Sequence, residues 1–409
     1  MGTYNIAYSI PYVLCLFCFT GLAFWEFRAL KYERSTDGVR ILTIALYLLF
    51  FGLRGFVFTD WYQYYYVFEK LPTIWDSGIA GLANDAALEF YATDETLGVS
   101  GLEPGFLYFS IFLKSIVPNY FFWIFINTVL DVWMLSVFVK RYSSYYALSF
   151  LLFFVFGGLT IQINLMRNIK ALFLFLLSLK YIEERRPILY FLFNAVGMLF
   201  HSTSILFFPL YFFLHRKFQT KWLWAILGLG IVVVLFQIQF VKPIVLQMAD
   251  IIGGRLGVQI KIYFALDFYS KSYGLSMGFV ERAFTYMILV LNYNRLIEQK
   301  KSNVLFINAF IIYFIVNSYL NEVFIIVDRV SMLFIFAYWI LYAELILMVK
   351  DTLNKWIWFS LMMAYGAMKL VVMNSNIFSK YDNLLFGIES FEERSQTRYH
   401  EKDNFKFVE

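Results

Sequence analysis

The chain has 409 residues, of which 61% are hydrophobic and only 15% are charged. Because a soluble domain normally has about a quarter of its residues charged, this composition excludes an ordinary water-soluble protein and indicates a helical membrane protein. The net charge of +5 is informative only through its distribution between loops, and no nucleic-acid partner is expected. The sequence has no P-loop, no dinucleotide-binding glycine pattern, no H-E-x-x-H and no cysteine metal cluster.

Apolar runs follow one another along the chain, and most are close to the twenty or so residues that cross a bilayer. They predict an all-α, polytopic membrane protein with about 12 transmembrane helices. The runs lie near residues 5–25, 39–58, 120–139, 145–163, 168–182, 188–200, 203–214, 222–241, 278–297, 303–321, 329–349 and 355–374. Segment 105–117 is also apolar but short, so we expect an interfacial or re-entrant helix there. The short runs 188–200 and 203–214 predict a hairpin with His201 at its turn.

The distribution of charge between these runs predicts a topology. Most connections are basic and are expected in the cytoplasm, whereas segment 59–104 has eight acidic residues against the single Lys70 and is expected outside. The N-terminus then starts outside. Loop 242–277 also falls outside although it is basic, which reflects either recruitment of an anionic substrate or the statistical nature of the rule. Residues 1–374 are predicted to form one integral membrane domain, with 59–119 as an outer loop with interfacial helices, and 375–409 an extramembrane tail.

Strongly polar residues at or next to the ends of apolar runs are the main functional signal in the sequence. Ionisable groups at membrane depth are costly unless they face a bundle interior or a wet cavity, so they indicate a functional site. In the predicted topology five of these six residues lie on the non-cytoplasmic side, and the sixth, Arg54, lies about a turn before the outer end of its span. The six residues are Arg54, Asp60, Glu103, Arg167, His201 and Arg329.

Asp60 has two interpretations from sequence. It is either the cap of a helix that begins at Trp61, or a carboxylate held where a span emerges. In the second case the rings of Tyr62, Tyr64 and Tyr65, which follow it directly, form a surface on which a sugar could bind. The sequence leaves both interpretations open.

Glu103 and His201 have a structural and a catalytic interpretation as well. Glu103 precedes Pro104, and an acid at that position stabilises the start of a helix. His201 is followed by three hydroxyl residues in an otherwise apolar stretch, so it is either a hydrogen-bonded packing residue or a general base or phosphate donor. Asp60, His201 and Glu103, in that order, are the candidates for a catalytic base.

Five cations are candidates for binding phosphate. Arg167 begins an apolar run, where a cation opposes the helix dipole but a guanidinium next to a helix N-terminus suits an anion. Lys170 lies one turn further along. Arg329 either binds phosphate or pairs with the aspartate before it, and Arg54 either binds phosphate or reaches the membrane surface. Arg282 lies one turn inside a run and needs a partner other than its neighbouring glutamate.

Four stretches resemble the EpsG-like family of Wzy-type polysaccharide polymerases. The pattern consists of an R…D…Y stretch, an acid–Gly–Phe segment, an M-R-x-x-x-A helix and an F-H-x-[ST]-[AS] hairpin. The stretches here are LRGFVFTDWYQYY, EPGFLYFSIFLK, INLMRNIKALFLFLLSLKYIEERR and NAVGMLFHSTSILFFPLYFFL. The resemblance covers roughly residues 40–345, has Asn168 where the family often has Gln, and assigns nothing to the C-terminal region.

The resemblance implies a GT-C-like glycosyltransferase of the bacterial inner membrane, acting on its extracytoplasmic face. Such an enzyme joins undecaprenyl-pyrophosphate-linked oligosaccharide repeats into O-antigen, capsule or exopolysaccharide. Its expected partners are that lipid-linked substrate, membrane lipid, a chain-length regulator and a flippase; no cofactor is expected, and a divalent metal is left open. The alternatives are another polyprenyl-linked glycosyltransferase or a ligase and, from a different class, a lipid-linked oligosaccharide flippase. Because the candidate charges gather on one side of the membrane, a polymerase is favoured over a flippase.

Overall fold

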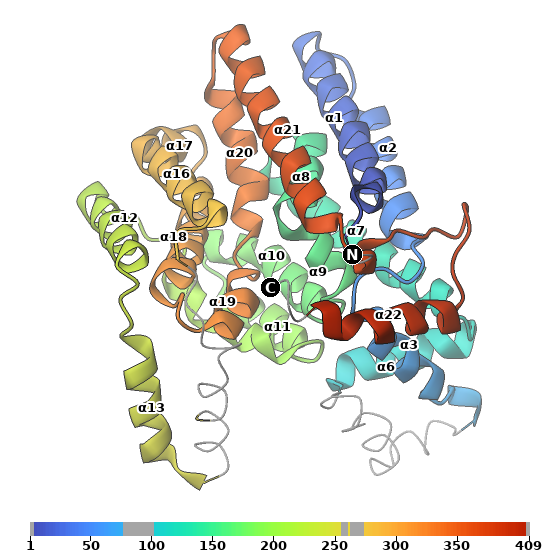
Figure 1. Cartoon of the computed structure of the whole chain (residues 1–409). Coiled ribbons are helices and arrows are strands. Elements are labelled where there is room, and N and C mark those ends of the chain that lie inside the picture. Colours follow the sequence, from blue (N-terminus) through green and yellow to red (C-terminus); the bar gives the residue numbers. More distant parts are fainter. Residues whose placement is uncertain (1–3, 77–101, 255–260, 262–273, 406–409) are drawn as a thin grey trace. The chain divides into compact units, whose positions relative to one another are not determined.

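The computed structural model describes residues 4–76, 102–254, 261 and 274–405, which form helices joined by loops and a few isolated bridges (Figure 1). The all-helical prediction is confirmed for this part of the chain. Four helices are long and apolar enough to cross a membrane, namely Ile6–Lys31, Tyr120–Tyr142, Tyr146–Ile163 and Thr352–Asn374. The protein is therefore a membrane protein, but the predicted count of about twelve spans is not confirmed, because most of the other apolar runs form shorter helices.

The short helices arise where polar or flexible residues interrupt an apolar run. The run 278–297 is divided at Asn292, whose side-chain amide donates to the Ile288 carbonyl at 2.9 Å and competes with the helix. The run 145–163 changes direction at Gly157, which has a φ of 81°. The predicted start of the helix near 329–349 is wrong, because one short helix ends at Ser331 and the next begins at Phe336.

The chain divides into two compact units, and the first contains Met1–Pro209 and Tyr342–Glu409. Its first half holds η1 (Ile6–Ser9), α1 (Ile10–Lys31), α2 (Asp37–Tyr47), η2 (Leu48–Gly52), α3 (Trp61–Lys70), α6 (Pro104–Ile116), α7 (Tyr120–Tyr142), α8 (Tyr146–Phe153), η4 (Phe154–Gly158) and α9 (Leu159–Ile163). It continues with α10 (Asn168–Glu183), α11 (Pro187–Met198), most of η5 (Ser202–Phe212), the last part of α20 (Phe336–Met348), α21 (Thr352–Asn374), η6 (Ile377–Ser379) and α22 (Phe391–Phe405).

The second unit contains Leu210–Leu341. Its helices are α12 (Thr220–Leu235), α13 (Val241–Ile252), α16 (Met277–Leu291), α17 (Tyr293–Gln299), α18 (Asn303–Tyr319), α19 (Phe324–Ser331) and the first part of α20 (Phe336–Met348). Residues 77–101 of the predicted outer loop, and 255–260 and 262–273 of the predicted basic loop, lie outside the described residues.

A buried polar network joins the helices of the first unit. The Lys170 Nζ atom of α10 lies 2.7 Å from the Asp131 Oδ1 atom of α7, and both side chains are 1% exposed. Gln162 of α9 donates to Asp131 at 2.9 Å and accepts a hydrogen bond from Tyr47 of α2. Because breaking such a buried pair is costly, the network holds the beginning of α10 firmly against α7 and α9.

Buried glutamates cap helices that are distant from them in sequence. Glu26 of α1 is 2% exposed and accepts the backbone N–H groups of Tyr146 and Ala147 at 2.6 and 2.9 Å, at the start of α8. In the second unit, Glu322 accepts the N–H of Val241 at 2.5 Å at the start of α13. A carboxylate at a helix N-terminus satisfies donors that have no partner within the helix, so these acids are accounted for structurally.

The segment after α21 folds back onto the residues between η2 and α3. The Phe58 N–H donates to the Phe378 carbonyl and the Gly55 N–H to the Asp382 carbonyl, both at 2.8 Å. A Cβ atom at Gly55 would lie 2.8 Å from the Asp382 Cβ atom, so the close approach requires glycine. The chain beyond Asn374 therefore packs against the same segment that carries the candidate Asp60.

Candidate functional site

The polar residues that the sequence singles out at the start of α10, the start of α6 and the turn before η5 come together in the first unit. Arg167 is the residue before α10, and one of its guanidinium nitrogens lies 2.8 Å from the Glu103 Oε2 atom. The other oxygen of Glu103 accepts the Ser202 N–H at 3.2 Å. The Arg167 and Glu103 side chains remain 23% and 16% exposed. This ion pair is therefore within reach of a ligand.

The residues next to Arg167 and Glu103 fix the backbone on both sides of the ion pair. Met166, 3% exposed, packs in an aromatic-rich cluster with Phe106 of α6, and so fixes the backbone next to Arg167. The Gly105 N–H donates to the Leu199 carbonyl at 2.7 Å, and a Cβ atom at Gly105 would lie 2.7 Å from that oxygen. The E-P-G-F stretch is thus shaped to place the start of α6 directly against the hairpin.

His201 belongs to the same group through a short chain of hydrogen bonds. Its Nδ1 atom accepts the Thr203 N–H at 3.2 Å and lies 2.8 Å from the Thr203 hydroxyl, which donates to the Asn168 side chain at 3.1 Å. Which of the two groups donates in the contact between Nδ1 and the Thr203 hydroxyl depends on the tautomer of the His201 ring.

Asp60 does not act as a helix cap. It occupies the residue before α3, yet its side chain makes no capping hydrogen bond. Its carboxylate instead accepts the Thr59 hydroxyl at 3.0 Å, and Thr59 in turn contacts the Asn164 side chain at 3.5 Å, three residues before Arg167. Of the two sequence interpretations, the capping role is thus not observed.

The three tyrosines that follow Asp60 have different surroundings. Tyr64 is hydrogen-bonded to Arg167, and burial raises the pKa of Tyr64 to about 12, so the phenol is neutral at physiological pH. Tyr62 and Tyr65 instead stack on Phe391 of α22, with ring centroids 5.8 and 4.3 Å apart. One face of each of these two rings is therefore covered by the C-terminal helix.

We define the Arg167 cluster as Asp60, Tyr64, Glu103, Arg167 and His201. Ion pairing and hydrogen bonds join Glu103, Tyr64 and the His201 turn to Arg167 or its neighbour Asn168, and Tyr64 interacts electrostatically with Asp60. Together the cluster offers a guanidinium for an anion and three groups able to accept a proton.

The other predicted cations lie elsewhere. Arg54 is 4% exposed and donates to the Phe51 carbonyl at 2.5 Å, and Lys170 is paired with Asp131, so both lie in the interior of the first unit. Arg282 and Arg329 belong to the second unit. Arg282 is hydrogen-bonded to Tyr313, and Arg329 is exposed in the last turn of α19 and does not begin a span.

Sequence reasoning did not identify Arg398. Its guanidinium carbon lies 4.4 Å from the centre of the Tyr62 ring, and it interacts electrostatically with Asp60. In the sequence Arg398 is one of two arginines in a strongly polar helix, which has no distinguishing pattern. In the part of the chain that the structure describes, no group of three or more His, Cys, Asp or Glu side chains is arranged to hold a metal ion.

Among the comparisons with known proteins, one family model matches the chain. Neither the curated proteins nor the solved structures include a match to this chain. The model of the EpsG family matches residues 39–383, which is most of the chain. The match includes every residue of the Arg167 cluster and extends past the expected limit near residue 345 into the segment that pairs with residues 53–58. The chain therefore belongs to the EpsG family of Wzy-like polymerases.

Proposed function

We propose that the protein is a polysaccharide polymerase that transfers undecaprenyl-pyrophosphate-linked oligosaccharide repeats onto one another. The proposal places the reaction at the outer face of a bacterial inner membrane. The observation that carries it is the Arg167 cluster, which combines a partly exposed guanidinium with candidate bases in a member of the EpsG family. O-antigen, capsule or exopolysaccharide is the expected product class.

In the proposed reaction, a sugar hydroxyl of the acceptor repeat attacks the anomeric carbon of the donor chain. The bond from that carbon to the pyrophosphate oxygen breaks, undecaprenyl pyrophosphate leaves, and the hydroxyl proton passes to a base. Arg167 stabilises the negative charge on the leaving group. Glu103 accepts a hydrogen bond from one guanidinium nitrogen of Arg167 and so orients the planar group. In the proposal, the remaining N–H groups of Arg167 bind phosphate oxygens.

The other cations have supporting roles in this proposal. Lys170 and Arg54 are buried, so they hold the helices around the cluster and do not contact the substrate in this conformation. Arg282 and Arg329 remain proposed pyrophosphate ligands on the grounds of their position in the sequence. Sugar binding is assigned first to Tyr64, because the other two tyrosines of the predicted aromatic surface stack on Phe391.

Asp60 is the proposed base, with His201 as a hydrogen-bonding partner of the pyrophosphate or the acceptor and Glu103 as the third candidate. Asp60 is favoured because its carboxylate is not used as a cap, whereas Glu103 is neutralised by Arg167. An Asp base stays active down to about pH 5, whereas a His base loses activity below about pH 6.5. The acidic limb of the pH–rate profile therefore distinguishes them.

The test is elongation of a purified lipid-linked repeat by the protein in nanodiscs. Asp60→Asn should reduce the rate by about 10²–10⁴ if Asp60 is the base. Arg167→Lys keeps the positive charge but loses the planar group that donates two parallel hydrogen bonds. Its elongation rate should therefore also fall strongly while the protein remains folded. Full-length polymer from Asp60→Asn and His201→Ala would remove both from the catalytic role. Failure of the wild-type protein to elongate any lipid-linked repeat would overturn the proposed function itself.

A further inference from the structure

The C-terminal helix α22 carries a cation to the Arg167 cluster from a part of the chain that lies outside the family match. The match ends at residue 383, and α22 begins at Phe391. The helix has no long apolar stripe that would explain its position by membrane insertion, since its residues FEERSQTRYHEKDNF are mostly polar. Its contacts with α3 must therefore come from specific side chains.

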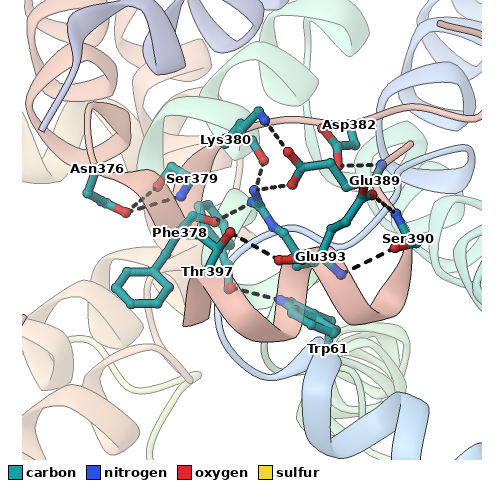
Figure 2. A network of polar contacts seen from close by, with 12 residues as sticks. Trp61, Asn376, Phe378, Ser379, Lys380, Asp382, Glu389, Ser390, Glu393 and Thr397 are labelled. Carbon is teal, nitrogen blue, oxygen red and sulfur yellow. Dashed lines mark hydrogen bonds and ion pairs between the residues drawn. The ribbon is translucent and has the colours of Figure 1, made fainter. Parts of the chain in front are cut away.

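Two residues of α22 hold the helix in place. The loop before it makes its own polar contacts, among them those of Lys380 and Asp382 with Glu389 (Figure 2). Arg394 is 3% exposed, donates to the Lys380 carbonyl at 2.7 Å and pairs with Glu389 at 3.1 Å. Phe391 packs on the aromatic rings of α3, closest to Tyr65 with centroids 4.3 Å apart. A buried, fully paired arginine and an aromatic contact at the start of the helix fix both its position and its rotation.

With Arg394 and Phe391 fixed, Arg398 lies one turn further along the same helix. Its guanidinium covers the Tyr62 ring at 4.4 Å, a distance at which a cation is attracted to the ring face. Tyr62 is two residues after Asp60, and Arg398 interacts electrostatically with the Asp60 carboxylate. The stacking therefore holds a positive charge on the first turn of α3, two residues after the carboxylate that the proposed reaction uses as its base.

We propose that Arg398 is a positioning residue of the polymerase site, which acts through the Asp60 carboxylate and is held in place by α22. This inference rests on the proposed function. Stacking on Tyr62 restricts the guanidinium, and its charge attracts and orients the Asp60 carboxylate. The groups that interact with Asp60 include Arg398 of α22, Tyr64 of α3 and the Thr59 hydroxyl.

The first experiment is the pH–rate profile of Arg398→Gln and Arg398→Lys in the elongation assay. A nearby cation lowers the pKa of a carboxylate, so Arg398→Gln should move the acidic limb about one pH unit upward. Turnover at neutral pH should fall on the order of tenfold, less than the loss for Asp60→Asn. Arg398→Lys keeps the charge, so its acidic limb should stay close to that of the wild-type protein.

Two control variants separate this effect from general damage. Gln396→Ala changes an exposed residue of the same helix, and Arg295→Gln removes an exposed arginine of the second unit. Both should leave the profile unchanged. An unmoved acidic limb in Arg398→Gln would overturn the inference while leaving the proposed function intact. A rise in turnover would also overturn it, because α22 would then act as a cover over the tyrosine rings.

The second experiment does not depend on activity. A double-mutant cycle with Asp60→Asn and Arg398→Gln measures whether the two changes in melting temperature are additive. The inference expects a double variant that loses less than the sum of the single losses. Additive losses would show that the two side chains are not coupled and would overturn the inference. If the wild-type protein elongates nothing, the proposed function fails, and this cycle still decides whether Arg398 and Asp60 interact.

Discussion

The ion pair between Arg167 and Glu103 gives the sharpest test of the site geometry. Its two side chains come from segments 64 residues apart, and the nitrogen–oxygen distance is 2.8 Å. We expect a double-mutant cycle with Glu103→Gln and Arg167→Gln to show coupling in the free energy of unfolding. Without that coupling, the start of α6 and the start of α10 would not meet as described.

The expected magnitude follows from the burial and the remaining partners of the pair. Removing one partner of a fully buried pair costs about 3–5 kcal/mol, and a hydrogen bond to a charged group contributes about 1.5–3 kcal/mol. The two side chains are partly exposed, and each keeps a second partner, Tyr64 for Arg167 and the Ser202 N–H for Glu103. We therefore expect a coupling of about 1.5–2 kcal/mol, or about a 10- to 30-fold change in the folding equilibrium.

The assay is a denaturant titration in detergent, followed by tryptophan fluorescence for the wild type, both single variants and the double variant. Glu298→Gln is the matched control, because it neutralises an exposed glutamate in the second unit and should change the midpoint little. Single losses that add within about 0.3–0.5 kcal/mol would refute the pairing. In that case Arg167 would have to be held by Tyr64 alone, and Glu103 would return to its role at the helix start.

Two further predictions concern the packing that supports the site. Lys170→Met leaves Asp131 buried without its cationic partner, so this variant should destabilise the protein by about 3–5 kcal/mol. Adding Asp131→Leu should recover much of that loss in the same titration. If the single variant is as stable as the wild type, the pair does not hold α10. Gly105→Ala should cost about 1–3 kcal/mol, because its Cβ atom would overlap Leu199, whereas Gly21→Ala, with open space around it, should be neutral or slightly stabilising. Equal midpoints for the two alanine variants would contradict the close approach of α6 to the hairpin.

The hydropathy of the local sequence was sufficient to predict several helices. The run 120–139 became α7 and the run 355–374 became α21, because a long apolar stretch without a breaker favours one continuous helix. The hydropathy pattern was insufficient where a single residue changes the direction of the chain. The backbone at Gly157 bends one apolar run, and the side chain of Asn292 divides another, although hydropathy alone predicts both runs to be straight and unbroken.

The candidate residues were also visible before the structure, since polar groups at the ends of apolar runs are rare and costly. Their individual roles were not. Arg167 and Lys170 lie one turn apart and carry the same charge, yet one faces Glu103 at a partly exposed position and the other faces Asp131 in the interior. Which of two neighbouring cations is accessible depends on the helices packed around them, and those come from distant parts of the chain.

Composition, hydropathy and the order of its motifs were enough to identify this chain as a helical membrane protein of the EpsG family, because these properties are local and accumulate along the sequence. The tertiary structure alone decided that Glu103 pairs with Arg167 and that Arg398 reaches Tyr62. Both contacts join segments separated by many residues, and the second starts from a helix without any sequence motif. Contacts of this kind depend on how the chain folds back on itself, as the segment after Asn374 does when it pairs with residues 53–58.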